Sequence, residues 1–257
     1  MKPKIDINCD LGESYGAFTM GNDAAIMPNI TSANVACGFH GGDPVTISRT
    51  VNLAKKSAVA VGAHPGFPDI MGFGRREIQL TREEVEKYII YQIGALQQFA
   101  RVAGMSLQHI KPHGAMYNMA AKDSKLADGI IGAMRAVDMR LIVFAPPKST
   151  LAKAAEKAGL RTAYEVFADR AYNSDGSLVS RSNPGAIINE PKKVVERAVK
   201  MVEEKAALSV DGKIVDFVDI HTICVHSDTM GAVKLATALK KGLVKAGITV
   251  EKVGKFV

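Results

Sequence analysis

The chain has 257 residues, of which 47% are hydrophobic and 23% charged, and its formal net charge is +7. The hydrophobic fraction is too high for a disordered chain, and no apolar run reaches the ~18 residues that a membrane helix needs. The first residues lack the apolar run and the cleavage site of a signal peptide. Because α/β barrels commonly fill about 200 to 250 residues as one unit, we expect residues 1–257 to form a single barrel domain away from membranes.

Charge placement and cysteine usage narrow the setting further. The lysines gather on predicted helix faces with few aromatic residues between them, which favours a solvated basic surface over a nucleic-acid site. The three cysteines, Cys9, Cys37 and Cys224, are an odd number and form no C-x-x-C pair. We therefore expect neither a disulfide framework nor a zinc knuckle, and a reducing cytoplasm is the simplest location.

Extended and helical patterns alternate from one end of the chain to the other. They predict strands at residues 5–9, 59–63, 107–111, 141–145, 162–167 and 220–225. The predicted helices follow these strands in turn, at residues 44–57, 82–103, 124–137, 149–158, 191–208 and 229–246. Asp211 and Gly212 are typical of a hairpin turn.

Capping residues support the helix starts. Asp43 followed by Pro44 predicts an N-cap and the first helical position, and Thr81 with Glu84 has the spacing of a capping box. Regular alternation of buried strands and helices implies right-handed crossovers and a parallel sheet. With about seven units of roughly 35 residues each, we expect a seven-stranded parallel (β/α) barrel of the TIM type; a doubly wound open sheet is the alternative.

Ionisable and amide side chains cluster where the predicted strands end. These clusters contain Asn8, Asp10, Glu13, Asn34, His40, Asp43, His64, His109, Lys111, His113, Glu165, Asp169, Arg170, His221 and His226. The carboxyl ends of parallel barrel strands open on one face, so the clusters are expected to converge there. A single histidine of this kind is more often structural. The position that the clusters share, at the carboxyl ends of the strands, is what indicates a functional site.

Two loops add to this face. The segment from Cys37 to Asp43 contains three glycines before a helix start, which suits either an anion site or a tight strand-to-helix turn. The connection at residues 65–79 is long, and its Arg75 and Arg76 would grip a carboxylate or phosphate, or else tie the loop down. No G-x-x-x-x-G-K-[ST] phosphate loop, G-x-S-x-G elbow or H-E-x-x-H helix occurs.

An ordered set of motifs in this chain resembles the LamB/YcsF family. They are N-C-D-L-G-E at residues 8–13, S-A-N-V-A-C-G-F-H-G-G-D-P at 32–44, G-A-H-P at 62–65 with G-F-G-R-R at 72–76, K-P-H-G-A-M-Y-N at 111–118, E-V-F-A-D-R-A-Y at 165–172 and C-V-H at 224–226. The resemblance implies a barrel related to the polysaccharide deacetylases and ATP-dependent opening of 5-oxo-L-proline to L-glutamate. It also implies two partners, 5-oxoprolinase subunits B and C, with ATP bound by this chain, a partner or their interface.

Opening a lactam needs a base for water, a proton donor for the leaving nitrogen and cations for the carbonyl oxygen. We expect the catalytic groups to be Asp10, Glu13, His40, His64, Lys111, His113, Glu165, Asp169, Arg170 and His226, and the substrate-binding groups to be Asn8, Asn34, Asp43, Arg75 and Arg76. Pro112 should fix the turn that places the His113 imidazole beside the Lys111 ammonium, which would keep the ring neutral.

Two other functions fit the same residues. Asp10, His64 and His113 resemble the Asp-His-His metal triad of deacetylase barrels, so a stand-alone amidohydrolase that uses a divalent metal such as Zn²⁺ on an acetylated sugar is the second hypothesis. The third hypothesis is a non-catalytic binding protein for a carboxylated metabolite.

Overall fold

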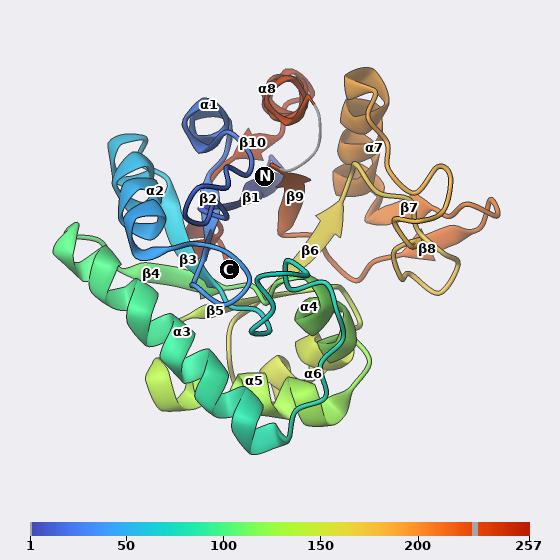
Figure 1. The fold of residues 1–257 in the computed structure, drawn as a ribbon. Coiled ribbons are helices and arrows are strands. Elements are labelled where there is room, and N and C mark those ends of the chain that lie inside the picture. Colours follow the sequence, from blue (N-terminus) through green and yellow to red (C-terminus); the bar gives the residue numbers. More distant parts are fainter. Residues whose placement is uncertain (1, 228–230) are drawn as a thin grey trace.

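Seven parallel strands close into a barrel within residues 2–227 and 231–257, the part of the chain that this computed structural model describes (Figure 1). The strands follow the order β1-β2-β3-β4-β5-β6-β9, and β9 pairs back onto β1. They are β1 (Lys4–Leu11), β2 (Ser32–Ala36), β3 (Ala60–His64), β4 (Leu107–Ile110), β5 (Ile142–Ala145), β6 (Thr162–Phe167) and β9 (Thr222–His226). The predicted seven-stranded TIM-like barrel is confirmed, and closure between β1 and β9 excludes the open sheet.

The strand β2 is the one barrel strand to which the sequence patterns assigned no range. Its residues, S-A-N-V-A, include a single β-branched side chain, so the local signal for a strand is weak. All five residues are nevertheless buried between β1 and β3. Tertiary pairing therefore decides this strand.

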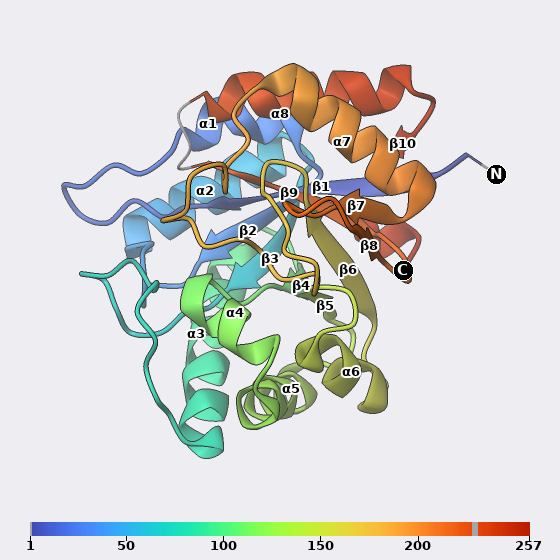
Figure 2. The same cartoon turned by 90° about the vertical axis from the view of Figure 1, so that its right-hand side faces the viewer.

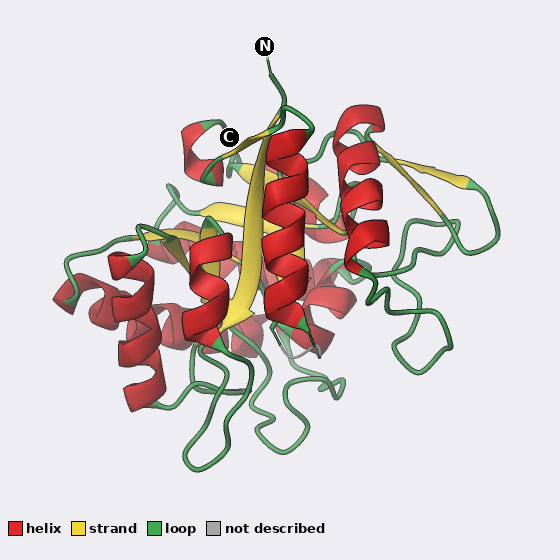
Figure 3. Ribbon diagram, turned by 90° about the horizontal axis from the view of Figure 1, so that it is seen from above, coloured by secondary structure: helices red, strands yellow, loops and turns green. Residues whose placement is uncertain are grey.

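Helices surround the strands on the outside of the barrel (Figure 3). They are α1 (Asp23–Ile26), α2 (Pro44–Lys56), α3 (Arg82–Val102), α4 (Gly114–Ala120), α5 (Ser124–Val137), α6 (Thr150–Lys157), α7 (Pro191–Glu204) and α8 (Ala232–Lys245), with short 3₁₀ turns η1 (Met27–Asn29) and η2 (Val253–Lys255). Asp43 caps α2, and Thr81 and Glu84 form the predicted capping box of α3. No helix in the described ranges is long and apolar enough to cross a membrane.

The helix predicted at residues 191–208 is too long and has to be corrected. The helix α7 ends at Glu204 because Lys205 takes a left-handed conformation, with φ 53°. The chain then forms β7 (Ala206–Leu208), which pairs antiparallel with β8 (Ile214–Asp216) around the predicted turn. The last helix, predicted from Thr229, begins at Ala232, and Thr229 itself lies outside the described residues.

The inside of the barrel is polar, and its hydrophobic core lies outside the strands. Along β1, Ile5 and Ile7 pack into the main apolar cluster with the helices, whereas Asp6, Asn8 and Asp10 alternate with them and bond to other side chains from within the barrel. TIM barrels normally fill their interior with branched apolar residues. Here a hydrogen-bonded network replaces them.

The two ends of the barrel differ. Both chain termini lie on one side of the barrel, and the long loops extend from the opposite side (Figure 2). At the amino end, η2 and a small cluster of Ile142, Phe144, Ala163 and Val253 close the barrel. A short strand, β10 (Thr249–Val250), extends the sheet there by pairing with β1. The carboxyl end opens into a cavity.

Candidate active site

The cavity at the carboxyl ends of the strands has a volume of about 1360 Å³. The chemistry-bearing side chains on its wall include Asp10, Glu13, His64, Lys111, His113 and Glu165. His226 and Arg170 line it from β9 and from the loop after β6. The strand-end clusters thus converge on one face, and His40 stands directly behind His113.

Lys111 lies at the centre of a buried polar network. Its ammonium donates to Asp10 Oδ1 at 3.0 Å, to Glu165 Oε1 at 2.9 Å and to Cys224 Sγ at 3.0 Å. Burial alone would lower the pKa of Lys111, but the charges of Asp10, Cys224 and Glu165 outweigh burial and hold this pKa well above its usual value. The lysine therefore remains a cation beneath the cavity.

Asp10 is held in the ionised form. Burial favours the neutral acid, yet the charges of His64 and Lys111 and a hydrogen bond with His64 keep the pKa of Asp10 well below its ordinary value. Asn34 also donates to Asp10 Oδ1 at 2.7 Å. Asp10 therefore lines the cavity as a carboxylate.

Two further members of this network were absent from the predicted site. Tyr117 of α4 donates its hydroxyl to Glu165 Oε2 at 2.5 Å, and Cys224 of β9 accepts from Lys111. Both had a weak signal in the sequence. Tyr117 follows His113 by one helical turn, and Cys224 stands two residues from His226, on the same face of an extended strand.

A histidine–aspartate pair lies beside this network, since His226 is the register partner of Asp10 on the neighbouring strand β9. His226 Nδ1 donates to Asp169 Oδ2 at 2.8 Å, which turns the rest of the imidazole toward the cavity. Burial would raise the pKa of Asp169, but the charge of His226 lowers it below its ordinary value. A carboxylate that orients an imidazole in this way is a common acid–base arrangement.

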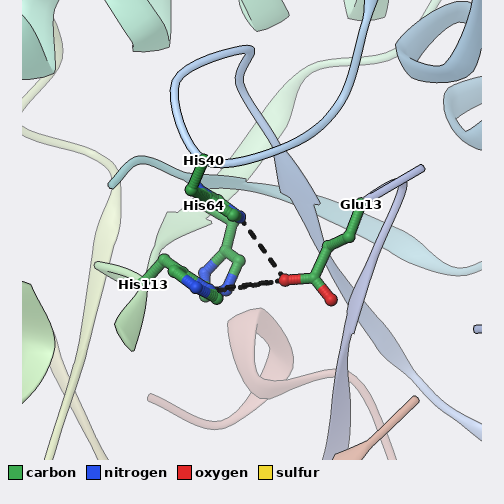
Figure 4. A group of neighbouring side chains, drawn as sticks. All are labelled: Glu13, His40, His64 and His113. Carbon is green, nitrogen blue, oxygen red and sulfur yellow. Dashed lines mark hydrogen bonds and ion pairs between the residues drawn. The ribbon is translucent and has the colours of Figure 1, made fainter. Parts of the chain in front are cut away.

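Three histidines and one glutamate gather beside Asp10 (Figure 4). His64 Nε2 and His113 Nδ1 are 2.9 Å apart, and Glu13 Oε1 lies 3.3 Å from His113 Nδ1 and 3.4 Å from His40 Nε2. Burial and then the charge of His64 lower the pKa of His113 to about 3, so its ring is neutral at pH 7. The neutral ring was expected, but the expected cause, Lys111, was not the main one.

The loop at residues 65–79 packs onto this cluster. Gly74 has φ 62°, and a Cβ there would lie 2.7 Å from His113 Cδ2 and 2.8 Å from His40 Cβ. Only glycine allows both this left-handed backbone and this close approach. The glycine therefore allows the loop to cover the two imidazoles.

The two arginines of the loop differ in position. Arg75 lines the cavity, with its guanidinium carbon 5.1 Å from the centre of the Phe73 ring. Arg76 instead donates to Asp69, a buried carboxylate that also accepts the backbone N–H of Gly72. Arg76 thus ties the loop down, as one interpretation predicted, whereas binding of a carboxylate or phosphate by Arg75 stays a prediction.

The remaining predicted binding residues lie outside the cavity wall. Asn8 and Asn34 are fully buried below it, where they bond to Glu165 and Asp10. Asp43 accepts the N–H groups of Val45 and Thr46 at the start of α2, and these bonds lower the pKa of Asp43 to about 2. In the glycine-rich segment before it, the N–H groups of Gly38 and Gly42 donate to the Gly41 and Ser14 carbonyl oxygens, so this segment is a tight turn that leads into a capped helix.

The donor set suits a metal ion as well as proton transfer. Among the described residues, Glu13, His40, His64 and His113 place ligand atoms within 4.8 Å of one another, and so do Asp10, Cys224 and His226. Imidazole nitrogen and carboxylate oxygen are ligands that Zn²⁺ accepts. In the second group the Lys111 ammonium already contacts Asp10 and Cys224. The first group is therefore the better fit.

Comparisons with known proteins agree first on the fold and then on the family. A solved peptidoglycan N-acetylglucosamine deacetylase superposes with a TM-score of 0.50 at 12% identity, over 99% of this chain and 87% of that one, which shows a shared barrel fold alone. The family model described as "LamB/YcsF family" matches residues 5–257. The chain belongs to the LamB/YcsF family.

The similar proteins within this family match along nearly their whole length. One from Tolumonas auensis, named as the A subunit of 5-oxoprolinase, is 48% identical over 96% of this chain and 98% of its own. One from Syntrophobacter fumaroxidans with the same name is 49% identical over 98% and 99%. The solved lactam utilization protein from Thermus thermophilus superposes with a TM-score of 0.91 at 46% identity, over 96% of this chain and 99% of that one.

Proposed function

We propose that the chain is a cyclic-amide hydrolase that acts as the A subunit of an ATP-dependent 5-oxoprolinase. It would open 5-oxo-L-proline to L-glutamate with cleavage of ATP to ADP and phosphate. The observation that carries the proposal is the cavity in which a buried ammonium, an oriented histidine and a carboxylate face one another at the strand ends. Full-length relatives named for this reaction support the choice of substrate.

The chemistry of the substrate explains why such a site is needed. A γ-lactam is an unactivated amide, so water attacks it slowly, and the open product tends to close again. A phosphoryl group transferred from ATP to the lactam oxygen makes the ring carbon electrophilic. Water then adds to that carbon, and the C–N bond breaks to leave a γ-acyl phosphate, which a second water hydrolyses to glutamate and phosphate. ATP cleavage thus drives the ring open.

We assign proton transfer to His226. Asp169 fixes the imidazole through Nδ1, so Nε2 is the nitrogen that takes a proton from the attacking water and returns it to the leaving ring nitrogen. The Lys111 ammonium, kept charged by its buried neighbours, would stabilise negative charge on the lactam oxygen and on the phosphoryl group that it receives. Asp10 and Glu165 hold Lys111 in place, and Tyr117 in turn holds Glu165.

Cationic side chains near the cavity mouth suit the carboxylate of 5-oxoproline. Arg170 lies on the wall, where Ala186 and Val179 carbonyl oxygens accept from its guanidinium, and Arg75 lies on the covering loop. Guanidinium groups bind carboxylates through paired N–H donors. We therefore propose that Arg170 and Arg75 bind the substrate carboxylate.

We also propose that subunits B and C complete the enzyme. The cavity of about 1360 Å³ exceeds the ~300–1,000 Å³ of ordinary small-molecule pockets, which leaves room for the phosphate donor or a partner segment. Phe18 and Met71, 81% and 92% exposed on loops that follow β1 and β3, offer apolar surface to a partner at this end.

We propose a cytoplasmic location for the enzyme, because the three cysteines Cys9, Cys37 and Cys224 are free thiols.

The test measures glutamate and phosphate release from 5-oxoproline and ATP by the purified chain, with and without subunits B and C. We expect turnover only when ATP and both partners are present, and loss of that turnover in Asp169→Asn, which removes the orienting carboxylate. Robust turnover by this chain alone would contradict the need for partners. Metal-dependent deacetylation of an acetylated sugar would favour the deacetylase hypothesis, and binding of 5-oxoproline without any turnover would favour a binding protein.

A further inference from the structure

Two buried imidazoles face each other through nitrogens that both accept when the rings are neutral, so a hydrogen bond between them needs an added proton. His64 Nδ1 lies 2.7 Å from the carbonyl oxygen of Lys111, and His113 Nε2 lies 2.8 Å from that of Phe73. A carbonyl oxygen only accepts, so each of these nitrogens carries the hydrogen. In neutral rings, the nitrogens left over, His64 Nε2 and His113 Nδ1, both present lone pairs, and they are only 2.9 Å apart.

Glu13 adds a third acceptor at the same point (Figure 4). Its Oε1 lies 3.3 Å from His113 Nδ1 and 3.9 Å from His64 Nε2, and its side chain is only 3% exposed. Three electron-rich atoms thus point at one another in a buried place. Such an arrangement needs a positive charge between the atoms, which either a proton on one ring or a metal ion supplies.

We propose that His64 Nε2, His113 Nδ1 and Glu13 Oε1 bind a divalent metal ion of the Zn²⁺ type. Bonds of about 2.0–2.2 Å in a tetrahedral site separate the ligand atoms by roughly 3.3–3.6 Å, and the three separations found here, 2.9, 3.3 and 3.9 Å, lie at or on either side of that range. The carbonyl oxygens that fix both rings are the outer partners that metal-binding histidines ordinarily have. The metal site does not depend on the proposed reaction.

His40 belongs behind this site rather than in it. Its ring stacks on His113 with centroids 3.6 Å apart and planes at 2°, so it lies on the far side of His113, although its Nε2 is also 3.4 Å from Glu13 Oε1. The other three residues line the cavity, whereas His40 does not. Three protein ligands and a fourth position toward the cavity are the arrangement of catalytic rather than structural zinc. An ion there would act as a Lewis acid toward an oxygen atom in the cavity.

The ligand set differs from the Asp10, His64 and His113 triad expected from the sequence. Asp10 Oδ2 lies 3.4 Å from His64 Nε2, but its other carboxylate oxygen is used by Lys111 and Asn34. Glu13 takes its place in the group whose ligand atoms are mutually close. This difference can be tested by substitution.

The test titrates the full chain, freed of metal by a chelator, with Zn²⁺ by calorimetry. We expect one ion per chain, and at least about 100-fold weaker binding in Glu13→Gln and in His113→Ala, since loss of an outer partner alone costs about 10–100-fold. Asp10→Asn should stay within about tenfold of the wild type, and His221→Gln, an imidazole at the amino end, is the matched control. Circular dichroism confirms that each variant is folded.

A second measurement needs no variant. Co²⁺ bound at the proposed site should give the intense visible absorption of a four-coordinate ion without a near-ultraviolet thiolate band, because its ligands are nitrogen and oxygen. A thiolate band would place the ion at Cys224 and overturn the assignment. Absence of stoichiometric binding by the folded wild type would overturn it too, as would wild-type affinity in Glu13→Gln together with loss of binding in Asp10→Asn.

Discussion

The two ends of the barrel bury the same kinds of residue for different purposes. At the amino end, Asp6 is fully buried, and the hydroxyl groups of Thr31, Ser32 and Thr222 all donate to it. At the carboxyl end, Glu13 lies among imidazole nitrogens at 3.3 to 3.9 Å. One carboxylate accepts from three hydroxyl groups, and the other lies at ion-pair distance from three imidazole nitrogens. The second arrangement is the one that calls for a ligand.

His109 and His113 make the same point with one residue type. Burial lowers the pKa of each to about 3, so the pKa does not distinguish them. His109 bonds to Asn34 and Gln108 through its two nitrogens and stacks on Phe144 with centroids 4.1 Å apart. His113 directs a nitrogen at another imidazole. The type of partner, rather than the size of the pKa shift, separates a structural histidine from a functional one.

The largest effect is expected at Lys111, because it is the cation that the buried carboxylates share. Lys111→Met leaves Asp10 and Glu165 without their ion pair, and we expect the free energy of unfolding to fall by about 3–5 kcal/mol, with loss of turnover by the assembled enzyme. Urea unfolding measures the first effect. Lys241→Met, on the exposed side of α8, is the control and should change stability by less than about 0.5 kcal/mol. Equal stability of the two variants would show that the network is unimportant.

Replacing His113 or His109 by alanine should have opposite effects on turnover and on stability. We expect His113→Ala to lower turnover of the assembled enzyme by about 100-fold while the melting temperature stays nearly unchanged. His109→Ala should do the reverse: the lost bond to Asn34 and the space beside Phe144 should cost about 3 kcal/mol of stability, with turnover changed by less than about tenfold. Melting curves and steady-state rates on the same preparations check both. A low rate together with a collapsed melting temperature in His113→Ala would break the contrast.

Asp6 allows the amino end to be tested by pH. Burial raises the pKa of Asp6 from 3.8 to about 6, against the hydroxyl bonds that lower it. A raised folded-state pKa means that the group contributes stability below about pH 4 and that this contribution is lost as the pH rises through 6. Between pH 4 and pH 7 the loss is about 2 kcal/mol. Asp6→Asn cannot ionise, so its free energy of unfolding should lack that fall.

Urea unfolding of wild type and Asp6→Asn at pH 4 and pH 7 isolates this one group, because every other titration is common to both proteins. The variant should gain relative to the wild type as the pH rises. A constant difference between the two proteins would show that Asp6 does not take up a proton on folding.

The fold was predictable because its signals are local and repeated. Capping residues such as Asp43 and Thr81, and apolar runs such as that of β5, mark the units directly. β2 lacked such a signal, and the end of α7 depends on a left-handed Lys205 that residue type does not favour. Pairing and backbone conformation set by distant parts of the chain decided both.

The candidate site was predictable as a location and not as a geometry. Strand ends gather on one face of a parallel barrel, so Asp10, His64 and His113 could be expected together. Which nitrogens of His64 and His113 face each other depends on the carbonyl oxygens of Lys111 and Phe73, respectively, whose positions no spacing reveals. The same holds for Asn34, which lies below the cavity although its motif lies among those of the site.

The smallest expected effect is the change of KM when an arginine of the loop at residues 65–79 is replaced. It tests whether a residue at the carboxyl end of the barrel is functional by its position alone. Arg75 and Arg76 are neighbours on one loop, but Arg75 lines the cavity and Arg76 is used by Asp69. If Arg75 binds the substrate carboxylate, Arg75→Ala should raise KM for 5-oxoproline by about tenfold, or about 1.4 kcal/mol, the scale of one hydrogen bond to a charged group, with kcat little changed. Arg76→Ala should leave KM within about twofold, because Arg76 bonds to Asp69 and does not line the cavity. Steady-state rates of both variants in the assembled enzyme measure these changes. A larger KM change in Arg76→Ala than in Arg75→Ala would mean that the tethered loop, rather than the guanidinium on the cavity wall, controls substrate binding.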